Sequence, residues 1–316
     1  SAGEEVLRVP ESVWASCSAE KAVREAPVAM VDHVRRVTDE FRKQGVAGAD
    51  RLQETVLLAL SLLVARGEPE GSSLLSAYAQ ALPASLEVPL LWDRERVELL
   101  RGTSAFEAIR TRAQFQSSLH SALFPGDTLP LPLFAWSWST ILSRASSKGG
   151  PYGMIPVLDL FNHAQSPSCG HVFDDASREW RVTALRTHEP GEQLCISYGA
   201  CGNAHLLRIY GFAIEGNTHD CVPLSVGGEG EGGESIELGW GTDPIAALAP
   251  LRRRRAQTSP HVREGWAAPA SLAGERAAVA EARTACDSAL AAFAPPAPET
   301  EVAELRGSGV EAWRRA

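Results

Sequence analysis

The sequence predicts an α+β fold, in which a β-rich core is interrupted by a helical insert and followed by a partial helical domain. Residues 19–145 carry helical patterns, residues 154–198 carry short strand-like runs, and the last part of the chain is rich in Ala and Arg. Of the 316 residues, 44% are hydrophobic and 22% are charged. These values are typical of a globular protein with one or two domains.

The expected elements begin with a strand-like run from Glu5 to Pro10. Residues 52–64 are apolar nearly all round, which predicts a helix that is buried on most sides. Asp93 is placed to cap a short helix. The segment from Ser104 to Glu107 has the pattern of a capping box and predicts the start of a long helix. A further apolar helix is expected from Phe134 to Ser146.

Short strands follow this helical part. Met154 to Leu160 is an apolar run consistent with a buried strand. Residues 171–173 and 180–185 flank a polar turn, and the second arm alternates apolar and polar side chains, which predicts a hairpin. Another strand is expected from Leu194 to Tyr198, and one or two helical turns from Asn203 to Tyr210.

The last part of the chain contains a glycine-rich segment and one amphipathic pattern. Gly228, Gly230 and Gly233 match a G-x-G-x-x-G spacing, but a dinucleotide site needs this spacing between a strand and a helix. Three glutamates in the same segment would also repel a pyrophosphate, so we expect a flexible linker or a hairpin tip. Apolar residues at helical spacing then predict one amphipathic helix: Val279, Ala282, Cys286, Leu290 and Phe293.

Charge and composition argue against two classes of partner. Lys and Arg number 30 and Asp and Glu 39, which gives a net charge of -9. Nucleic-acid binding needs a basic surface, and the only basic run is Arg252 to Arg255. The longest apolar stretches are about ten residues, far fewer than the roughly 20 that span a bilayer. We therefore expect neither a nucleic-acid nor a membrane partner.

The cysteines indicate a reduced, intracellular protein. They are scattered, without a close C-x-x-C pair. Cys169 and His171 are near each other, but no second pair of ligands accompanies them, so no metal is expected. Cys195 and Cys201 lack a His and an acid spaced for thiol catalysis, and we interpret both as small core or loop residues.

Two segments carry a family resemblance. The first is Asp159-Leu160-Phe161-Asn162-His163, and the second runs from Gly191 to Gly199 and continues into Asn203–Phe212. Both resemble the signature motifs of SET-domain protein methyltransferases, in the branch of the plant Rubisco large-subunit lysine methyltransferase. Segments such as Ser76-Ala77-Tyr78 resemble the helical insert of this branch.

This resemblance implies a division of the chain. Residues 1–225 would form a SET domain whose helical insert covers about residues 19–145. The chain starts after the position of the family's Gly-rich turn, so an N-terminally truncated domain is expected. Residues 226–316 would be a linker and a partial C-terminal helical domain that helps to bind a protein substrate.

The resemblance also implies a reaction. S-adenosylmethionine would be the cofactor, and its methyl group would pass to a side-chain nitrogen of a specific non-histone protein. Lysine is the preferred acceptor, and histidine is the alternative. Such a transfer is an in-line displacement, which requires alignment and a neutral nitrogen. A monomer in the cytoplasm, the nucleus or a plastid is expected.

The site residues follow from the motif positions. Tyr198 would be the catalytic residue, and Tyr210 would form a wall of the target channel. Asn162 and His163 would hold the adenosine and amino-acid parts of the cofactor. The complete cofactor-binding set implied by the resemblance is Arg144, Asp159, Leu160, Phe161, Asn162, His163, Tyr198, Gly211 and Phe212.

Other interpretations of these residues stay open. A tyrosine that closes a strand is commonly half-buried core, and this applies to both Tyr198 and Tyr210. Arg144, near a helix end, can cap carbonyls or pair with Asp159 as well as contact a ligand. For the whole chain, the alternative is a non-catalytic SET scaffold that binds a protein partner.

Overall fold

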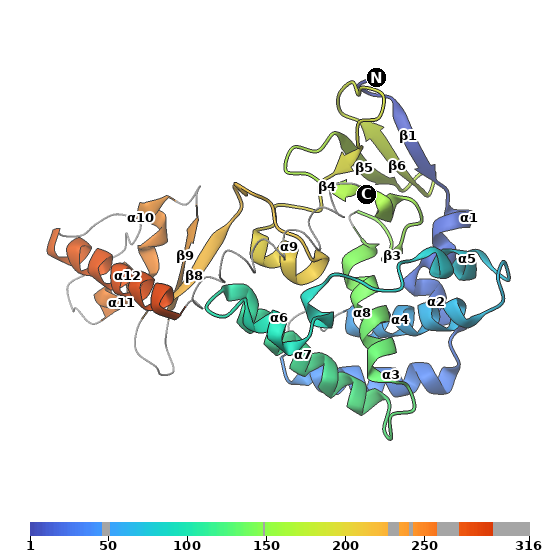
Figure 1. The fold of residues 1–316 in the computed structure, drawn as a ribbon, viewed down its shortest axis with the longest axis horizontal. Coiled ribbons are helices and arrows are strands. Elements are labelled where there is room, and N and C mark those ends of the chain that lie inside the picture. Colours follow the sequence, from blue (N-terminus) through green and yellow to red (C-terminus); the bar gives the residue numbers. More distant parts are fainter. Residues whose placement is uncertain (46–50, 148, 227–233, 240–242, 258–271, 293–316) are drawn as a thin grey trace. The chain divides into compact units, whose positions relative to one another are not determined.

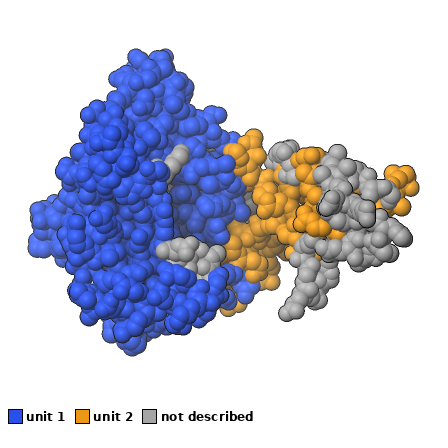
Figure 2. Space-filling model, turned by 180° about the vertical axis from the view of Figure 1, so that it is seen from behind, with its two compact units in different colours: residues 1–91, 109–217 blue, residues 92–108, 218–316 orange. Residues whose placement is uncertain are grey.

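The computed structural model describes residues 1–45, 51–147, 149–226, 234–239, 243–257 and 272–292, and it contains both helices and strands, as predicted (Figure 1). Contacts divide the chain into two compact units (Figure 2). The first unit comprises residues 1–91 and 109–217, and the second comprises residues 92–108 and 218–316. The boundary expected at 225/226 falls inside strand β8, Cys221–Val226, and the domain division stays a prediction.

A three-stranded antiparallel sheet forms one end of the first unit (Figure 1). Its order is β1 (Glu5–Val9), β6 (Glu179–Ala184), β5 (Cys169–Asp174), which confirms the predicted opening strand and hairpin. In β6 the side chains of Trp180, Val182 and Ala184 are buried, as the alternation indicated. These side chains therefore form the core on one face of the sheet.

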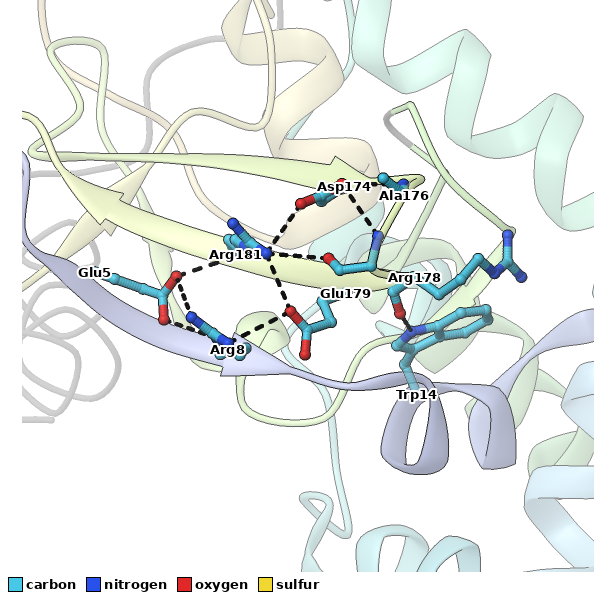
Figure 3. A network of polar contacts seen from close by, with 9 residues as sticks. Glu5, Arg8, Trp14, Asp174, Ala176, Arg178, Glu179 and Arg181 are labelled. Carbon is cyan, nitrogen blue, oxygen red and sulfur yellow. Dashed lines mark hydrogen bonds and ion pairs between the residues drawn. The ribbon is translucent and has the colours of Figure 1, made fainter.

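The opposite face of this sheet carries a network of charges (Figure 3). Arg181 contacts Asp174 at 3.0 Å and Glu179 at 3.3 Å, and Arg8 of β1 contacts Glu5 at 2.9 Å and Glu179 at 3.7 Å. Exposed ion pairs contribute little individually, but a network that joins three strands helps to set their register. It thereby connects the beginning of the chain to the hairpin.

Helices separate β1 from the next strands, and α4 lies at their centre. Leu57, Leu58 and Leu62 of α4 are buried, which confirms the predicted helix. Helices α2, α3, α5 and α8 pack around α4. The helical elements of this stretch are α1 (Glu11–Trp14), η1 (Ala15–Cys17), α2 (Ala19–Glu25), α3 (Val28–Lys43), α4 (Leu52–Gly67), α5 (Leu74–Ala81), η3 (Pro89–Leu91), α6 (Arg94–Glu98), α7 (Ser104–Leu123) and α8 (Leu131–Arg144).

The predicted N-terminal cap is confirmed for α6 but not for α7. Asp93 caps α6 as expected, because its Oδ1 accepts the Arg96 N–H at 2.8 Å. The capping box at Ser104 is wrong: Thr103 lies one residue earlier, and its Oγ1 accepts the Phe106 N–H at 3.2 Å. Helix α8 also starts earlier than expected, after Pro130, with a proline in its first turn, a position where proline is favoured.

The predicted strand from Met154 to Leu160 is wrong. Only Gly153–Met154 is a strand, β3, which pairs with β2 (Ala145–Ser146), and Leu158–Leu160 is a 3-10 turn, η4. Pro156 has no N–H for a strand ladder, and Val157 has φ +71°, which ends the extended chain. The backbone therefore turns sharply just before the Asp159 motif.

The remaining elements of the first unit are short. Of the strand predicted from Leu194 to Tyr198, only β7 (Cys195–Ile196) is formed, and it pairs in parallel with β4 (Asn162–His163). Helix α9, Asn203–Tyr210, lies where it was predicted.

The second unit contains a hairpin and helices. Strand β8 pairs antiparallel with β9 (Glu234–Gly239), and the glycine-rich segment 227–233 between them lies outside the described residues. Helices α10 (Pro244–Ala247), α11 (Ala249–Gln257) and α12 (Leu272–Ala292) follow.

The predicted face of α12 is confirmed only in part. Ala282 is buried and Cys286 packs against the core, as predicted, but Val279 and Leu290 are exposed, and Ala278 is buried in addition. Phe293 lies outside the described residues. Small side chains thus form the packed face, which lets the helix approach strand β8 closely. In the described part of the chain, every helix is too short or too polar to cross a bilayer.

Candidate active site

The two family motifs meet through the parallel pair of β4 and β7. Asn162 lies opposite Cys195, and His163 lies opposite Ile196. The Ala164 N–H donates to the Ile196 carbonyl at 3.0 Å and extends this pairing. The Asn-His segment therefore lies beside the strand that leads directly to Tyr198.

His163 holds the backbone of Tyr198. Its Nδ1 accepts the Tyr198 N–H at 3.0 Å, 35 residues along the chain. A nitrogen that accepts carries no proton, so the neutral ring has its proton on Nε2. The two rings lie 5.3 Å apart, and the Phe212 ring lies 6.2 Å from His163 and 6.5 Å from Tyr198. His163 and Phe212 thus fix the position of Tyr198.

A hydrogen bond fixes the Tyr198 hydroxyl as well as its backbone. The hydroxyl donates to the main-chain carbonyl of Phe161 at 2.7 Å, and the Tyr210 ring lies 4.7 Å from the Tyr198 ring. Burial, with a smaller contribution from Tyr210, raises the pKa of Tyr198 to about 12. The phenol is therefore protonated at neutral pH, with its proton directed at Phe161.

Asp159 is the centre of a buried polar cluster. Its Oδ2 accepts from Arg144 Nη1 at 2.8 Å and from the Tyr78 hydroxyl at 2.7 Å. The side chain of Asp159 is 1% exposed and that of Arg144 is 19% exposed. Burial, together with the Asp159 charge, raises the pKa of Tyr78. The other carboxylate oxygen, Oδ1, is buried and has no hydrogen-bond partner among the described residues.

Asp159 and Tyr198 line the same pocket, which has a volume of about 300 Å³. Arg144, Asp159, Tyr198 and Tyr210 supply charged and polar groups, and Ile155, Leu158 and Ile196 supply apolar walls. Serines 143, 146 and 147, at and after the end of α8, add hydroxyl-bearing side chains. A pocket of this size with a few convergent polar groups fits a small organic ligand.

Only some of the predicted site residues line the pocket. Four of them line the pocket (Arg144, Asp159, Tyr198 and Tyr210), and Phe161, His163 and Phe212 contact Tyr198. Asn162 lies in β4, opposite Cys195. Leu160 is 64% exposed and does not line this pocket, so its role as a cofactor contact stays a prediction.

Gly211 has a packing role in the structure. It ends α9 with φ +83°, and a Cβ at this position would lie 2.2 Å from the carbonyl oxygen of Glu87. Only glycine tolerates both conditions. This close approach positions Tyr210 and Phe212, its two neighbours in the chain. A direct contact between Gly211 and a cofactor stays a prediction.

Sequence reasoning missed two residues of the site. Tyr78 hydrogen-bonds Asp159 across 81 residues, and its only signal was the resemblance of the Ser76-Ala77-Tyr78 segment to the family's insert. His171 lines the pocket, although the sequence drew attention to it only as a neighbour of Cys169. Among the described residues, no three or more His, Cys, Asp and Glu side chains cluster as metal ligands would.

Comparisons with known proteins identify the family. Residues 2–199 match the SET domain family. An actin-histidine N-methyltransferase from Danio rerio is 29% identical over 218 residues, which are 60% of this chain and 36% of that protein. SET domain-containing protein 4 from Mus musculus is 30% identical over 194 residues, 54% of this chain and 44% of that protein. The chain thus spans less than half the length of these curated relatives.

Solved structures show the same fold. The SET domain of LSMT bound to lysine and AdoHcy aligns with a TM-score of 0.70 at 19% identity, over 98% of this chain and 76% of that chain. Rubisco LSMT bound to AdoMet aligns with a TM-score of 0.68 at 18% identity, over the same shares of the two chains.

Proposed function

Because the chain belongs to the SET-domain family, whose match covers residues 2–199, we propose that it transfers a methyl group from S-adenosylmethionine to a side-chain nitrogen of a protein. The observation that carries this proposal is the position of Tyr198. Tyr198 lines a pocket together with the Arg144–Asp159 ion pair and a second tyrosine, Tyr210.

The residues of the pocket fit S-adenosylmethionine. Arg144 is a partner for its carboxylate, and the unpartnered Oδ1 of Asp159 is an acceptor for its ammonium group. Asn162 and His163 remain proposed contacts for the rest of the molecule. When bound, the cofactor supplies a methyl group on a positively charged sulfur.

Tyr198 orients the accepting nitrogen. Since its proton is donated to Phe161, the remaining lone pairs of its oxygen can accept from an amine and face positive charge near the methyl group. The raised pKa keeps the phenol neutral, so it does not attract an ammonium ion as a phenolate would. Apolar walls from Ile155, Leu158 and Ile196 favour the neutral form of the amine.

Lysine is the proposed acceptor, and histidine is the alternative. The aligned LSMT structure holds lysine, whereas the relative from Danio rerio is named for histidine. Tyr210 would contact the accepting side chain. The substrate would be a specific non-histone protein, bound with the help of the C-terminal helical part in residues 226–316.

A compartment inside the cell is also part of the proposal. All six cysteines are free thiols, which agrees with a reducing environment such as the cytoplasm, the nucleus or a plastid. We further propose that the chain acts as a monomer.

The variant Tyr198→Phe tests the proposal. It removes one oxygen from the pocket, so methyl transfer should fall by about a hundredfold or more while the fold and S-adenosylmethionine binding persist. The matched control is Tyr152→Phe, whose hydroxyl contacts Thr55 at 3.2 Å and does not line the pocket. Transfer should be measured with labelled cofactor, and binding by calorimetry.

Two outcomes would count against the proposal. Full activity of Tyr198→Phe would exclude the assigned role of the hydroxyl. Failure of the unmodified chain to bind S-adenosylmethionine would favour a SET scaffold without catalytic activity.

A further inference from the structure

Three basic side chains gather near Tyr210. Arg112 lies on α7, and His205 and Arg208 lie one turn apart on α9. Arg208 Nη2 is 3.4 Å from His205 Nδ1, and the His205 ring lies 6.3 Å from the Tyr210 ring. We call Arg112, His205 and Arg208 the basic cluster. It is continuous with the proposed wall of the target channel.

Among the described residues, the basic cluster has no negatively charged partner. In the part of the chain that the structure describes, neither Arg112 nor Arg208 forms an ion pair with a carboxylate, whereas Arg144 and Arg186 each do. The Nε of Arg208 is buried and has no hydrogen-bond acceptor among the residues that the structure describes. Unpaired donors of this kind are costly to bury, so a built site that lacks its acceptor is the simplest explanation.

A further unpaired donor lies next to Arg112. Gln116 follows four residues later on the same face of α7, is 4% exposed, and has a buried Nε2 without a partner in the described part of the chain. Guanidinium and amide N–H groups both donate to anions.

Electrostatics within the basic cluster are repulsive. Desolvation, followed by the charge of Arg208, lowers the pKa of Arg112. Desolvation and the two guanidinium groups also lower the pKa of His205. Since the chain as a whole carries a net charge of -9, this excess of positive charge is a local feature. A bound anion would relieve the repulsion at all three side chains.

We propose that the basic cluster is a specificity subsite, which binds a carboxylate side chain of the protein substrate close to the methylated residue. This inference rests on the proposed function. The ring-to-ring steps from Tyr198 to Tyr210 and on to His205 are 4.7 and 6.3 Å. An extended peptide advances about 3.3 Å per residue, so the acidic residue lies within about three positions of the target.

Peptides with one acidic position test the proposal. Lysine-centred peptides carry Glu or, as the isostere, Gln at each position from three before to three after the lysine, and histidine-centred peptides form a second set. With the unmodified chain, one Glu position should lower KM by about tenfold relative to Gln, as a charge-assisted hydrogen bond does. The turnover number should change little, because the contact is remote from the methyl group.

Variants of the basic cluster test whether it causes the preference for Glu peptides. Arg112→Gln and Arg208→Gln should each remove the preference for Glu while leaving the turnover number and S-adenosylmethionine binding unchanged. Arg208→Lys should retain part of the preference, since the charge is kept. Arg36→Gln, an exposed arginine on α3, is the matched control and should retain all of it.

A binding measurement tests the subsite independently of catalysis. The imidazole NMR signal of His205, assigned with His205→Asn, is titrated with the Glu peptide, the Gln peptide and inorganic phosphate. The Glu peptide should saturate the signal and raise the pKa of His205, and the Gln peptide should not.

Three outcomes would overturn the inference. They are equal KM values for Glu and Gln peptides at every position, saturation of His205 by phosphate but not by the Glu peptide, and no response to either. The second would mean that the site holds a free anion. Failure of S-adenosylmethionine binding in calorimetry would instead remove the proposed function, and the His205 titration would still decide whether the basic cluster binds a carboxylate.

Discussion

Asp159 has both a structural and a proposed chemical role in the pocket. One oxygen of its buried carboxylate binds Arg144 and Tyr78, and the other is directed at no described residue. A buried charge of this kind persists only when its partners compensate the loss of water. Its neutralisation would leave Arg144 without a carboxylate, although the shape of the pocket would hardly change.

The variant Asp159→Asn should lower the free energy of unfolding by about 3 kcal/mol, because it leaves the partly buried charge of Arg144 without its carboxylate. It should also weaken S-adenosylmethionine binding through the loss of the Oδ1 acceptor charge. The control Tyr78→Phe removes only one hydrogen bond to the same carboxylate and should cost about 1 kcal/mol. Urea unfolding and calorimetry measure both effects. Equal costs for the two variants would contradict the role of the charge.

The loop between β6 and β7 leads to Tyr198, and hydrogen bonds to the Glu192 side chain stabilise this loop. Glu192 accepts from Arg186 through Oε1 and from the Glu189 N–H through Oε2 at 3.1 Å. The hydrogen bond from Arg186 is the main reason why the pKa of Glu192 falls to about 2. This pair fixes the entry of the chain into β7 and therefore the register of β7 with the Asn-His segment.

The lowered pKa predicts a pH dependence of stability. The folded-state pKa is about 2 and the ordinary value is 4.5, so the stabilisation is complete above pH 4.5 and is lost as the pH falls towards 2. The urea midpoints of the unmodified chain and of Glu192→Gln should therefore differ most at pH 7, and the difference should shrink steadily as the pH falls from 4.5 towards 2. Glu215→Gln, on an exposed turn, is the control and should change the midpoint little at any pH. A difference that stays constant down to pH 3 would contradict this assignment.

At the scale of the whole molecule, the pocket belongs to one compact unit. Every residue that lines the pocket lies in residues 109–217, whereas α12 and the β8–β9 hairpin belong to the second unit. A ligand that binds only the folded pocket stabilises it by about 2.7 kcal/mol at a hundred times its Kd. The stabilisation should appear in the unit that contains the pocket.

Hydrogen exchange detected by mass spectrometry can locate this stabilisation. With S-adenosylmethionine, peptides from residues 144–163 and 195–212 should exchange more slowly, and peptides from 221–226, 234–239 and 272–292 should be unchanged. Tyr198→Phe should show the same pattern, because it retains binding. Protection confined to the second unit would contradict the proposed location of the cofactor site.

Local patterns in the sequence were sufficient for several elements. The alternation in residues 180–184 identified the hairpin, the apolar run 52–64 identified the buried helix α4, and the Asp93 cap was correct. The motifs selected Tyr198, Asp159 and Arg144, and all three line the pocket. These features succeed because periodicity, capping and motif identity depend on residues close together in the chain.

The sequence alone thus determined the family, the α+β class and three of the residues that line the candidate pocket. Tertiary structure alone decided the left-handed turn at Val157 that replaced an expected strand, and the parallel pairing of Asn162 with Cys195. It also decided the hydrogen bond of Tyr78 to Asp159 and the gathering of Arg112 with His205 and Arg208. Each of these depends on contacts between segments far apart in the chain, and such contacts are selected by burial and by the pairing of polar groups over the whole fold.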